Sequence, residues 1–510
     1  MTRYIKGDNR NQLNLIPISF DEMIDENNPV RVIDALVESF DMVALGVNHA
    51  KTKVKGRKPY NPKHLLKLYM YGYFNGVRSS RKLERECRRN IEVMWLIDRL
   101  TPDDKTISNF RKDNKKALME VFKQFSILCN ELGLYGKKII AVDGSKFRAN
   151  NSRRKNYTKN KVKKMLEYYE EAAKKYIELL DDNDDEEKNA ETIKHSKEEI
   201  QNKLDNAKKR IKELTEMAEE IEKNGEISIT DPDSKHMSVS NNGTDIAHNV
   251  QVAVDSENHI VVAVDVVSTP ADQNQLYNMA SKAVEALEIE EESESEELIT
   301  ALADKGYYSG EDLNKCKEAK IRTIVAKQKS STKTGNQDYS KDNFKYDKEK
   351  DIYICPQGKI LKNRSRKDSK FQLYRNSNEC RECKYKSECT SNKKGRSIKR
   401  GEYQEIYDEV DKRTKENKEL YRQRQMIVEH PFGTIKRGLG FTYFLTRGNE
   451  SVKAESSMHF FTYNLIRVIN IVGVKELTQI LEEKKHAFFY FPYISVIFDK
   501  ARKKYLWNCT

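Results

Sequence analysis

Short apolar segments typical of buried β-strands recur in the middle of the chain. One of them, residues 137–143, ends on Asp143. Residues 248–269 alternate apolar and polar positions on both sides of a Ser-Glu-Asn tripeptide, which is the pattern of a β-hairpin. Two further strands are expected at 299–304 and 321–327, with a helical segment between them. This pattern predicts an α/β core, in which helices flank a mixed sheet.

The first part of the chain has a different pattern. Apolar residues recur at helical spacing over 28–45 and 60–98, and Asp103 or Asp104 can cap a further helix. We therefore expect an all-α domain over residues 1–130. Its last helices resemble a helix-turn-helix, with a plain packing helix as the alternative.

Positive charge is concentrated in two blocks. The 510 residues carry a formal net charge of +13, but residues 51–90 and residues 359–400 carry +11 each, so the remainder is −9. Clustered Lys and Arg side chains neutralise phosphates and release condensed counterions. The two blocks favour a nucleic acid as the partner, and solvated surface faces are the alternative.

Two polar helical segments separate the first strand from the β-hairpin. Apolar residues step by four and three over 165–179 and again over 200–221, which is the heptad pattern of packed helices. An acidic run at 181–187 lies between them. We expect an antiparallel helical hairpin inserted over residues 158–228, with dimerisation or DNA contact as a secondary role.

Three acidic residues have contexts that suit metal-dependent chemistry. Asp143 and Asp304 each end an apolar strand, and Glu429 lies in a helical segment over 421–440. Adjacent carboxylates repel one another unless a cation neutralises them. Mg²⁺ accepts carboxylate oxygens, keeps positions for water and phosphate oxygens, and supports in-line phosphoryl displacement when two ions act together. Taken singly, each acid could also be a helix cap or a surface charge.

The motifs around these acids resemble those of a known family. AVDGSKFRA around Asp143, ADKGYYS around Asp304 and Y-x2-R followed by E-x6-K around Glu429 are similar to the DDE transposases of bacterial insertion sequences. The closest likeness is to members with a helical N-terminal domain and a Cys-bearing insertion, and it extends over about residues 15–475. The resemblance implies an RNase H-like core in which the three acids bind two Mg²⁺ or Mn²⁺ ions.

Three residues near Glu429 match signature positions of that family. They are Tyr421, Arg424 and Lys436. The resemblance implies that the side chains at these positions bind phosphates at the transposon end. Arg424 lies one residue further from Glu429 than the family pattern requires, so Arg422 is an alternative, whereas Lys436 has the expected spacing.

The segment over 421–440 contains a helix breaker. If the segment is helical, Gln425, Glu429 and Lys436 lie near one stripe of its surface. Pro431 lacks a backbone N–H and should bend or restart the helix shortly after Glu429.

Four cysteines form a second group before Glu429. Cys355 opens a Cys-Pro-Gln-Gly turn, and Cys380, Cys383 and Cys389 follow inside the second basic block. Four thiolates suit a tetrahedral structural Zn²⁺. The alternative is a set of free cysteines that pack a small basic subdomain.

Several other polar residues near the predicted core are expected to be structural. His236 and His248 fall in this class, as do Asp231, Asp233 and Asp255. Asp272 precedes a helical segment, and we expect it to cap that helix.

These observations divide the chain into six parts. They are a helical N-terminal DNA-binding domain over 1–130, an RNase H-like catalytic core over 137–157 and 229–328, the helical hairpin over 158–228, a basic Cys-rich insertion over 329–405, a C-terminal catalytic helix region over 406–480 and a tail over 481–510. The residues expected to contact DNA are Tyr421, Arg424, Lys436, Arg57, Lys58, Arg81, Lys82, Arg88 and Arg111.

The function implied by the resemblance is DNA transposition. The protein would bind the terminal inverted repeats of its element, hydrolyse phosphodiesters with Mg²⁺ and transfer the freed strand to target DNA, as a homodimer on double-stranded DNA. The alternatives are a DNA-binding regulator derived from a transposase and a stand-alone metal-dependent nuclease. The longest aromatic-rich apolar run, residues 488–498, is too short to span a membrane, and cysteines are sparse, so we expect a bacterial cytoplasmic, nucleoid-associated protein.

Overall fold

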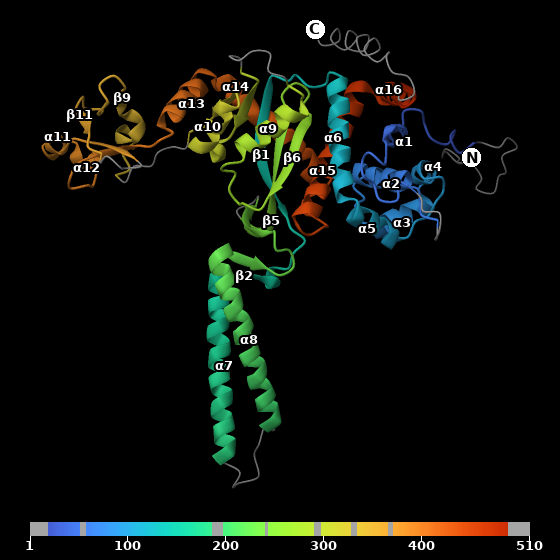
Figure 1. Cartoon of the computed structure of the whole chain (residues 1–510), viewed down its shortest axis with the longest axis horizontal. Helices are drawn as coiled ribbons and strands as arrows, with labels where there is room; N and C mark the ends of the chain where they lie inside the picture. Colours follow the sequence, from blue (N-terminus) through green and yellow to red (C-terminus); the bar gives the residue numbers. More distant parts are fainter. Residues whose placement is uncertain are drawn as a thin grey trace, which may run out of the picture.

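A mixed β-sheet lies at the centre of the molecule, and helices cover it (Figure 1). The computed structural model describes residues 19–51, 58–185, 197–239, 243–289, 297–327, 334–365 and 371–487. The sheet strands are β1 (Ile139–Arg148), β4 (Lys235–Val239), β5 (Gly243–Asp255), β6 (Val261–Val267), β7 (Ile299–Ala303) and β8 (Ile321–Val325). None of the described helices is both long and apolar enough to cross a membrane.

The pairing of these strands combines antiparallel and parallel neighbours. β5 pairs antiparallel with β1, β4 and β6, while β1 pairs in parallel with β7, and β7 in parallel with β8. The predicted hairpin is present as β5 and β6. The mixed sheet with flanking helices is confirmed, and its strand order is consistent with an RNase H-like core.

Strand β1 is longer than the sequence suggested. It was expected to end on Asp143, but it continues to Arg148 because the long strand β5 still pairs with it there. The parallel pairing with β7 does stop early, at Val142 opposite Ala303. Asp143 is therefore the first residue of β1 that has passed the end of β7.

The N-terminal region is helical, as predicted. Its helices are α1 (Pro29–Ser39), α2 (Pro62–Phe74), α3 (Ser80–Arg89), α4 (Ile91–Leu96), α5 (Asp104–Asp113) and α6 (Lys115–Glu131). The segment 60–98 is broken because Gly76 adopts a positive φ of 70° and the Asn90 side chain caps α4. Asp103 caps α5 and accepts a hydrogen bond from Thr106 N at 2.7 Å. Helices α3 and α5 pack together, but α4 lies between them in the chain, so they are not the two-helix unit predicted.

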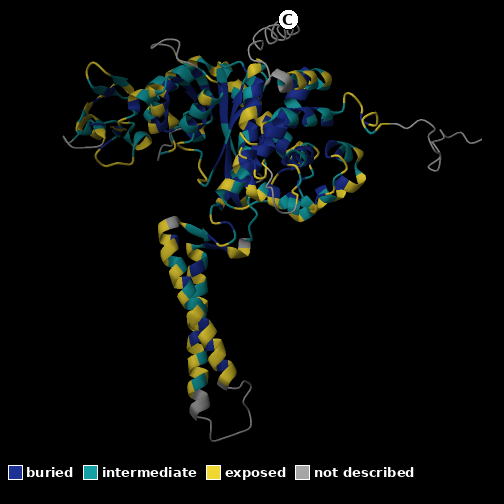
Figure 2. Cartoon of the chain, turned by 45° about the vertical axis from the view of Figure 1, so that its right-hand side comes forward, coloured by how far each residue is buried: buried dark blue, intermediate teal, exposed yellow. Residues whose placement is uncertain are grey.

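The helical hairpin projects away from the rest of the molecule (Figure 1). It consists of α7 (Lys159–Asp185) and α8 (Lys197–Asn224), with the short strands β2 (Asn156–Thr158) and β3 (Glu226–Ser228) at its base. Val162 packs with Ile221 near the base and Ala173 with Leu204 further out, so the helices are antiparallel. Most of its surface is exposed, in contrast to the buried sheet (Figure 2).

Helices from the second half of the chain cover the sheet and join it to the N-terminal helices. They are α9 (Leu276–Ala286), α10 (Gly310–Glu318), α13 (Gln404–Glu416), α14 (Lys418–Gly433), α15 (Asn449–Val472) and α16 (Val474–Ala487). Helix α15 packs on α6 and β6, and the rings of Phe125 and Phe461 are 5.1 Å apart. Arg78, in the loop between α2 and α3, is buried and donates to Glu455 Oε1 at 3.2 Å. One continuous hydrophobic core therefore includes the N-terminal helices, the sheet and α15.

A small second sheet carries the four cysteines. Its strands are β9 (Lys345–Asp347), β10 (Ile352–Ile354), β11 (Ile360–Asn363), β12 (Gln372–Arg375) and β13 (Ser397–Arg400), all antiparallel, next to α11 (Ser377–Arg381) and α12 (Lys386–Cys389). It has its own core of Phe344, Tyr353, Leu361, Tyr374 and Ile398. The remaining short turns are η1 (Arg153–Lys155), η3 (Gln337–Tyr339) and η4 (Lys341–Asn343).

Candidate active site

Asp143 lies at the edge of the sheet where β1 extends beyond β7. Its Oδ1 accepts a hydrogen bond from Gly144 N at 2.8 Å, and its Oδ2 lies 3.9 Å from Arg424 Nη1. The pKa of Asp143 is raised to about 6, mainly by burial and also by the charges of Asp304 and Asp272, against the opposing effects of Gly144 N–H and Arg424. A half-buried carboxylate with other acids around it is a favourable place for a cation.

Asp304 reaches the same edge from the neighbouring strand. It directly follows β7 and caps the turn η2 (Lys305–Tyr307), where its Oδ1 accepts from Gly306 N at 2.6 Å. Because β1 and β7 are parallel, both strands deliver their aspartate to one edge. The structure thus brings Asp143 and Asp304 together, as the pattern of strand-terminal acids predicts.

Glu429 lies on α14, the helix that packs on β1. The rings of Phe432 and Phe147 are 6.4 Å apart across this contact. Glu429 itself is exposed, and its Oε1 accepts from Gln425 Nε2 at 2.7 Å. Within the described part of the chain, its carboxylate makes no contact with Asp143 or Asp304, so the structure places the helix beside them but not the carboxylate.

Pro431 does not restart the helix, which was one of the two outcomes predicted for it. The helix continues through Pro431 to Gly433 and then changes to a π-helical turn, η5 (Thr434–Gly438). The wider turn follows the position where proline removes a hydrogen bond.

Arg424 and Arg422 occupy different surroundings. The Arg424 side chain is 15% exposed, points to Asp143 and lies over the Tyr421 ring at 5.8 Å. Arg422 is 73% exposed and pairs with Glu419 at 2.7 Å. Arg424 is therefore the arginine that lies at the carboxylates, despite its irregular spacing from Glu429.

Lys436 lies on the η5 turn and contacts strand β1 beyond Asp143. Its Nζ donates to Ser145 Oγ at 2.6 Å and to Lys146 O at 2.8 Å, and it lies 4.4 Å from the centre of the Phe147 ring. Burial lowers the pKa of Lys436 to about 8, and the charge of Lys146 contributes. Arg424 and Lys436 thus flank Glu429 from both sides along α14 and η5.

The other predicted DNA contacts differ in their surroundings. Arg81, Lys82 and Arg88 are exposed on α3, where Arg81 pairs with Asp104 and Arg88 with Glu84. Lys58 is exposed as well, and Arg57 lies outside the described residues. Arg111, on α5, was expected to contact DNA. It is instead half-buried, and its Nη1 is fully covered.

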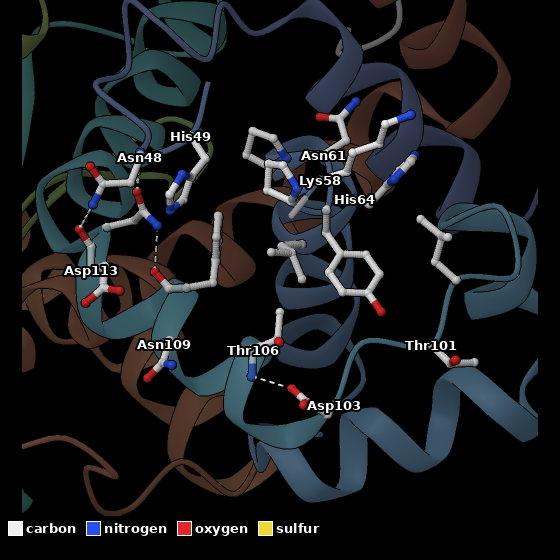
Figure 3. A pocket seen from close by; sticks show the side chains of 17 residues that line it. Asn48, His49, Lys58, Asn61, His64, Thr101, Asp103, Thr106, Asn109 and Asp113 are labelled. Atoms are coloured by element: carbon white, nitrogen blue, oxygen red, sulfur yellow. Dashed lines mark hydrogen bonds between the residues drawn. The ribbon is translucent and has the colours of Figure 1, made fainter. Parts of the chain in front are cut away.

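A cavity of about 820 Å³ lies among the N-terminal helices (Figure 3). Polar side chains including Asn48, His64 and Asn109 line it. Asn48 N donates to Asn114 Oδ1 and Asn48 Nδ2 to Asp113 O, both at 2.7 Å. None of its lining residues comes from the strands or helices that carry Asp143, Asp304 and Glu429.

The four cysteines of the small sheet lie close together. Burial raises the pKa of the Cys389 thiol to about 11, and the charges of Cys380, Cys355 and Cys383 also raise it. Cys355 Sγ accepts a hydrogen bond from Lys359 N at 3.3 Å, within the Cys-Pro-Gln-Gly turn. Among the described residues, however, no three His, Cys, Asp or Glu side chains form a group with the geometry to hold a metal ion. This finding applies both to the cysteines and to the carboxylates.

Asp272, which lies near these carboxylates, has a different role from the one expected from the sequence. Asp272 does not cap α9, because that helix begins at Leu276 with Gln275 as its N-cap. Its Oδ1 instead accepts hydrogen bonds from side chains of β1 and β5. The pairing of both β1 and β6 with β5 brings the loop after β6 to the edge where Asp143 lies, and no local sequence signal marks this position.

The predicted structural residues lie away from these acids. His248 and Asp231 form a fully buried pair at 2.9 Å, and His236 is exposed on β4. Asp233 accepts from Asn449 N at 2.7 Å at the start of α15. Asp255 accepts three backbone N–H groups at the opposite end of the sheet.

Two family descriptions match the chain. Residues 18–113 match the transposase domain DUF772, and residues 354–469 match a transposase DDE domain. The first match covers helices α1 to α5, and the second contains the four cysteines and Glu429. No curated protein matches the chain. The chain thus carries a match to a transposase DDE domain together with a match to the N-terminal transposase domain DUF772, and a DDE domain implies polynucleotidyl transferase activity.

Proposed function

We propose that this protein cuts phosphodiester bonds at the ends of a transposable element and joins the freed strands to target DNA. The observation that carries the proposal is the meeting of Asp143 and Asp304 at one sheet edge, beside the helix that carries Glu429. The matches to the two transposase domains support the same conclusion.

Asp143, Asp304 and Glu429 are the residues that would hold Mg²⁺ or Mn²⁺. The donor set fits, because hard divalent cations prefer carboxylate oxygens, and the pKa of Asp143 is raised first by burial and then by the charges of Asp304 and Asp272, which a cation would offset. When bound there, two such ions would supply activation of the attacking oxygen and charge stabilisation of the leaving one. The exposed side chain of Glu429 accepts a hydrogen bond from Gln425, and a change of its rotamer on DNA binding would turn it towards the aspartates.

Arg424 and Lys436 are suited to holding the phosphates on both sides of the scissile bond. Arg424 is kept next to Asp143 by Tyr421 and offers a planar fork of N–H donors. Lys436 is held by Ser145 and a backbone oxygen, both of which a phosphate oxygen can replace. Their positive charges orient the DNA strand, and Arg424 also balances the charge of Asp143.

The N-terminal helices are the proposed site of sequence recognition at the element ends. The exposed cations of α3, among them Arg81 and Arg88, face solvent and form ion pairs that DNA phosphates can exchange. Because these helices share a core with the sheet, DNA bound to α3 has a defined position relative to Asp143. We infer a homodimer in the DNA complex, since two ends must be paired.

We also propose that the small sheet binds one structural Zn²⁺ through its four cysteines. Their proximity and the N–H bond to Cys355 Sγ support this assignment. Bound zinc would draw the thiolates into a closed tetrahedral site. The zinc would stabilise the subdomain and have no part in the chemistry.

Incubation of the purified protein with DNA that carries the element ends tests the function. Nicking is expected with Mg²⁺ or Mn²⁺ and not with EDTA, and alanine at Asp143, Asp304 or Glu429 should abolish it while DNA binding persists. A wild-type protein that binds DNA but never nicks it would favour the regulator. Glutamine at the exposed Glu219 of α8 provides a control variant that should nick normally.

A further inference from the structure

Asp272 belongs to the loop that connects β6 to α9. Because β6 and β1 both run antiparallel to β5, they run in the same direction, and the loop after β6 emerges at the edge of Asp143 and Asp304. The side chain of Asp272 is 23% exposed. Asp272 is thus a fourth acidic residue at the proposed site.

One oxygen of Asp272 gathers donors from two strands. Its Oδ1 accepts from Lys146 Nζ at 2.9 Å and from Asn249 Nδ2 and Gln251 Nε2, both at 2.8 Å. Lys146 lies on β1, while Asn249 and Gln251 are buried on β5. Its Oδ2 has no hydrogen-bond partner among the described residues. Asp272 therefore ties its loop to both strands next to Asp143.

Gly144 makes this approach possible. A Cβ atom at Gly144 would lie 2.6 Å from Asp272 Oδ1 and 2.2 Å from Gln251 Nε2. Both distances are too short for any side chain. The glycine that directly follows Asp143 thus provides the space in which the Asp272 carboxylate reaches the sheet.

A second connection leads from Asp272 to the turn of Asp304. The Tyr307 hydroxyl donates to Gln251 Oε1, and Tyr307 is the last residue of the turn that Asp304 caps. A Cβ atom at Gly306 in the same turn would lie 3.8 Å from Asp272 Cβ. Hydrogen bonds therefore run from Asp272 through Gln251 to Tyr307 and connect the surroundings of Asp143 and Asp304.

We propose that Asp272 is a positioning residue of the active site, which holds the loop after β6 against β1 and β5 beside Asp143 and neutralises Lys146. This inference rests on the proposed function of the same site. An asparagine could accept the same hydrogen bonds but would leave the Lys146 ammonium unpaired beside the carboxylates. That extra positive charge would repel an incoming divalent cation.

The test compares Asp272→Asn with a matched control, Asp255→Asn. Asp255 likewise accepts three N–H groups, but it is fully buried and lies at the other end of the same strand pair. Mn²⁺ binding to the metal-free full-length protein is measured by the electron paramagnetic resonance signal of the free ion. The Mg²⁺ concentration for half-maximal nicking and the affinity for end DNA are measured alongside.

We expect Asp272→Asn to weaken Mn²⁺ binding and to raise the Mg²⁺ requirement about 10- to 100-fold, as is typical for partners of metal-binding residues. DNA affinity should be unchanged, and Lys146→Met combined with Asp272→Asn should restore part of the Mn²⁺ affinity. Asp255→Asn should behave like the wild type in all of these assays. A Gly144→Ala variant should reproduce the loss, because its methyl group displaces Asp272.

Two results would overturn the inference. One is wild-type Mn²⁺ affinity in Asp272→Asn when Asp143→Asn has lost it. The other is an equal loss in Asp272→Asn and Asp255→Asn, which would indicate a role in folding alone. A wild-type protein that binds Mn²⁺ but does not nick DNA would refute the proposed function instead, and the Mn²⁺ comparison would still decide the role of Asp272.

Discussion

Neutralising Asp143 should stabilise the metal-free protein while it abolishes activity. Burial and the neighbouring acids raise the pKa of Asp143 from 3.8 to about 6, so its ionised form is disfavoured in the folded state. At about 1.4 kcal/mol per unit, a shift of about two units corresponds to about 3 kcal/mol. The side chain is 27% exposed, and solvent screening reduces the expected gain for Asp143→Asn to about 1 to 2 kcal/mol.

The sign of the pH dependence follows from the two pKa values. Below about pH 4 the carboxyl is protonated in both the folded and the unfolded protein, and asparagine brings no advantage. The advantage grows as the pH rises from about 4 to about 6, since the unfolded chain ionises first, and it is complete above about pH 6.

Urea unfolding of both proteins in EDTA, at about pH 5 and about pH 8, measures this difference. The variant should be more stable at both values, with the larger gain at the higher pH. Adding Mg²⁺ should stabilise the wild type and not the variant, because only the wild type binds the ion well. An Asp143→Asn protein that is less stable than the wild type at about pH 8 without metal would refute the reasoning.

Three further predictions concern other parts of the molecule. Because the pKa of Lys436 is about 8, DNA affinity should fall as the pH rises through that value. Lys436→Met should remove this pH dependence, whereas Lys436→Arg should keep high affinity at alkaline pH. Fluorescence anisotropy measures the affinity of both variants, and an unchanged pH profile in Lys436→Met would contradict the assignment. Metal analysis should find about one zinc per chain, lost on replacing Cys380 and Cys383 by serine, and freely titratable cysteines in the native protein would rule the site out. Arg78→Met should lower the free energy of unfolding by about 3 to 5 kcal/mol, since it leaves the buried Glu455 without its cation. Adding Glu455→Gln to the same chain should restore part of that free energy, as measured by urea unfolding.

The sheet edge that carries Asp143 and Asp304 could be predicted because its signals are local. Each aspartate ends an apolar run, and parallel strands place their carboxyl ends at one edge. The antiparallel helical hairpin was predictable for a similar reason, since its heptad spacing specifies which residues of each helix are buried. A pattern over a few turns or one strand was sufficient in both cases.

The roles that sequence did not predict depend on long-range contacts. Asp272 precedes α9 by four residues and resembles a cap, yet its partners come from β1 and β5, and only the direction of β6 brings them together. The length of β1 beyond Asp143 depends on β5 in the same way. Arg111 is the exception, because it lies four residues after the buried Ile107 and so falls on the inner stripe of α5.

The most direct test of the proposed activity is whether the protein joins DNA strands. Labelled end DNA, a target plasmid and Mg²⁺ should give a covalent donor–target product with the wild-type protein. The same reaction with Asp304→Asn, which keeps the shape of the turn cap, should give none. Cut ends that are never joined to the target would contradict the transposase assignment and indicate a nuclease.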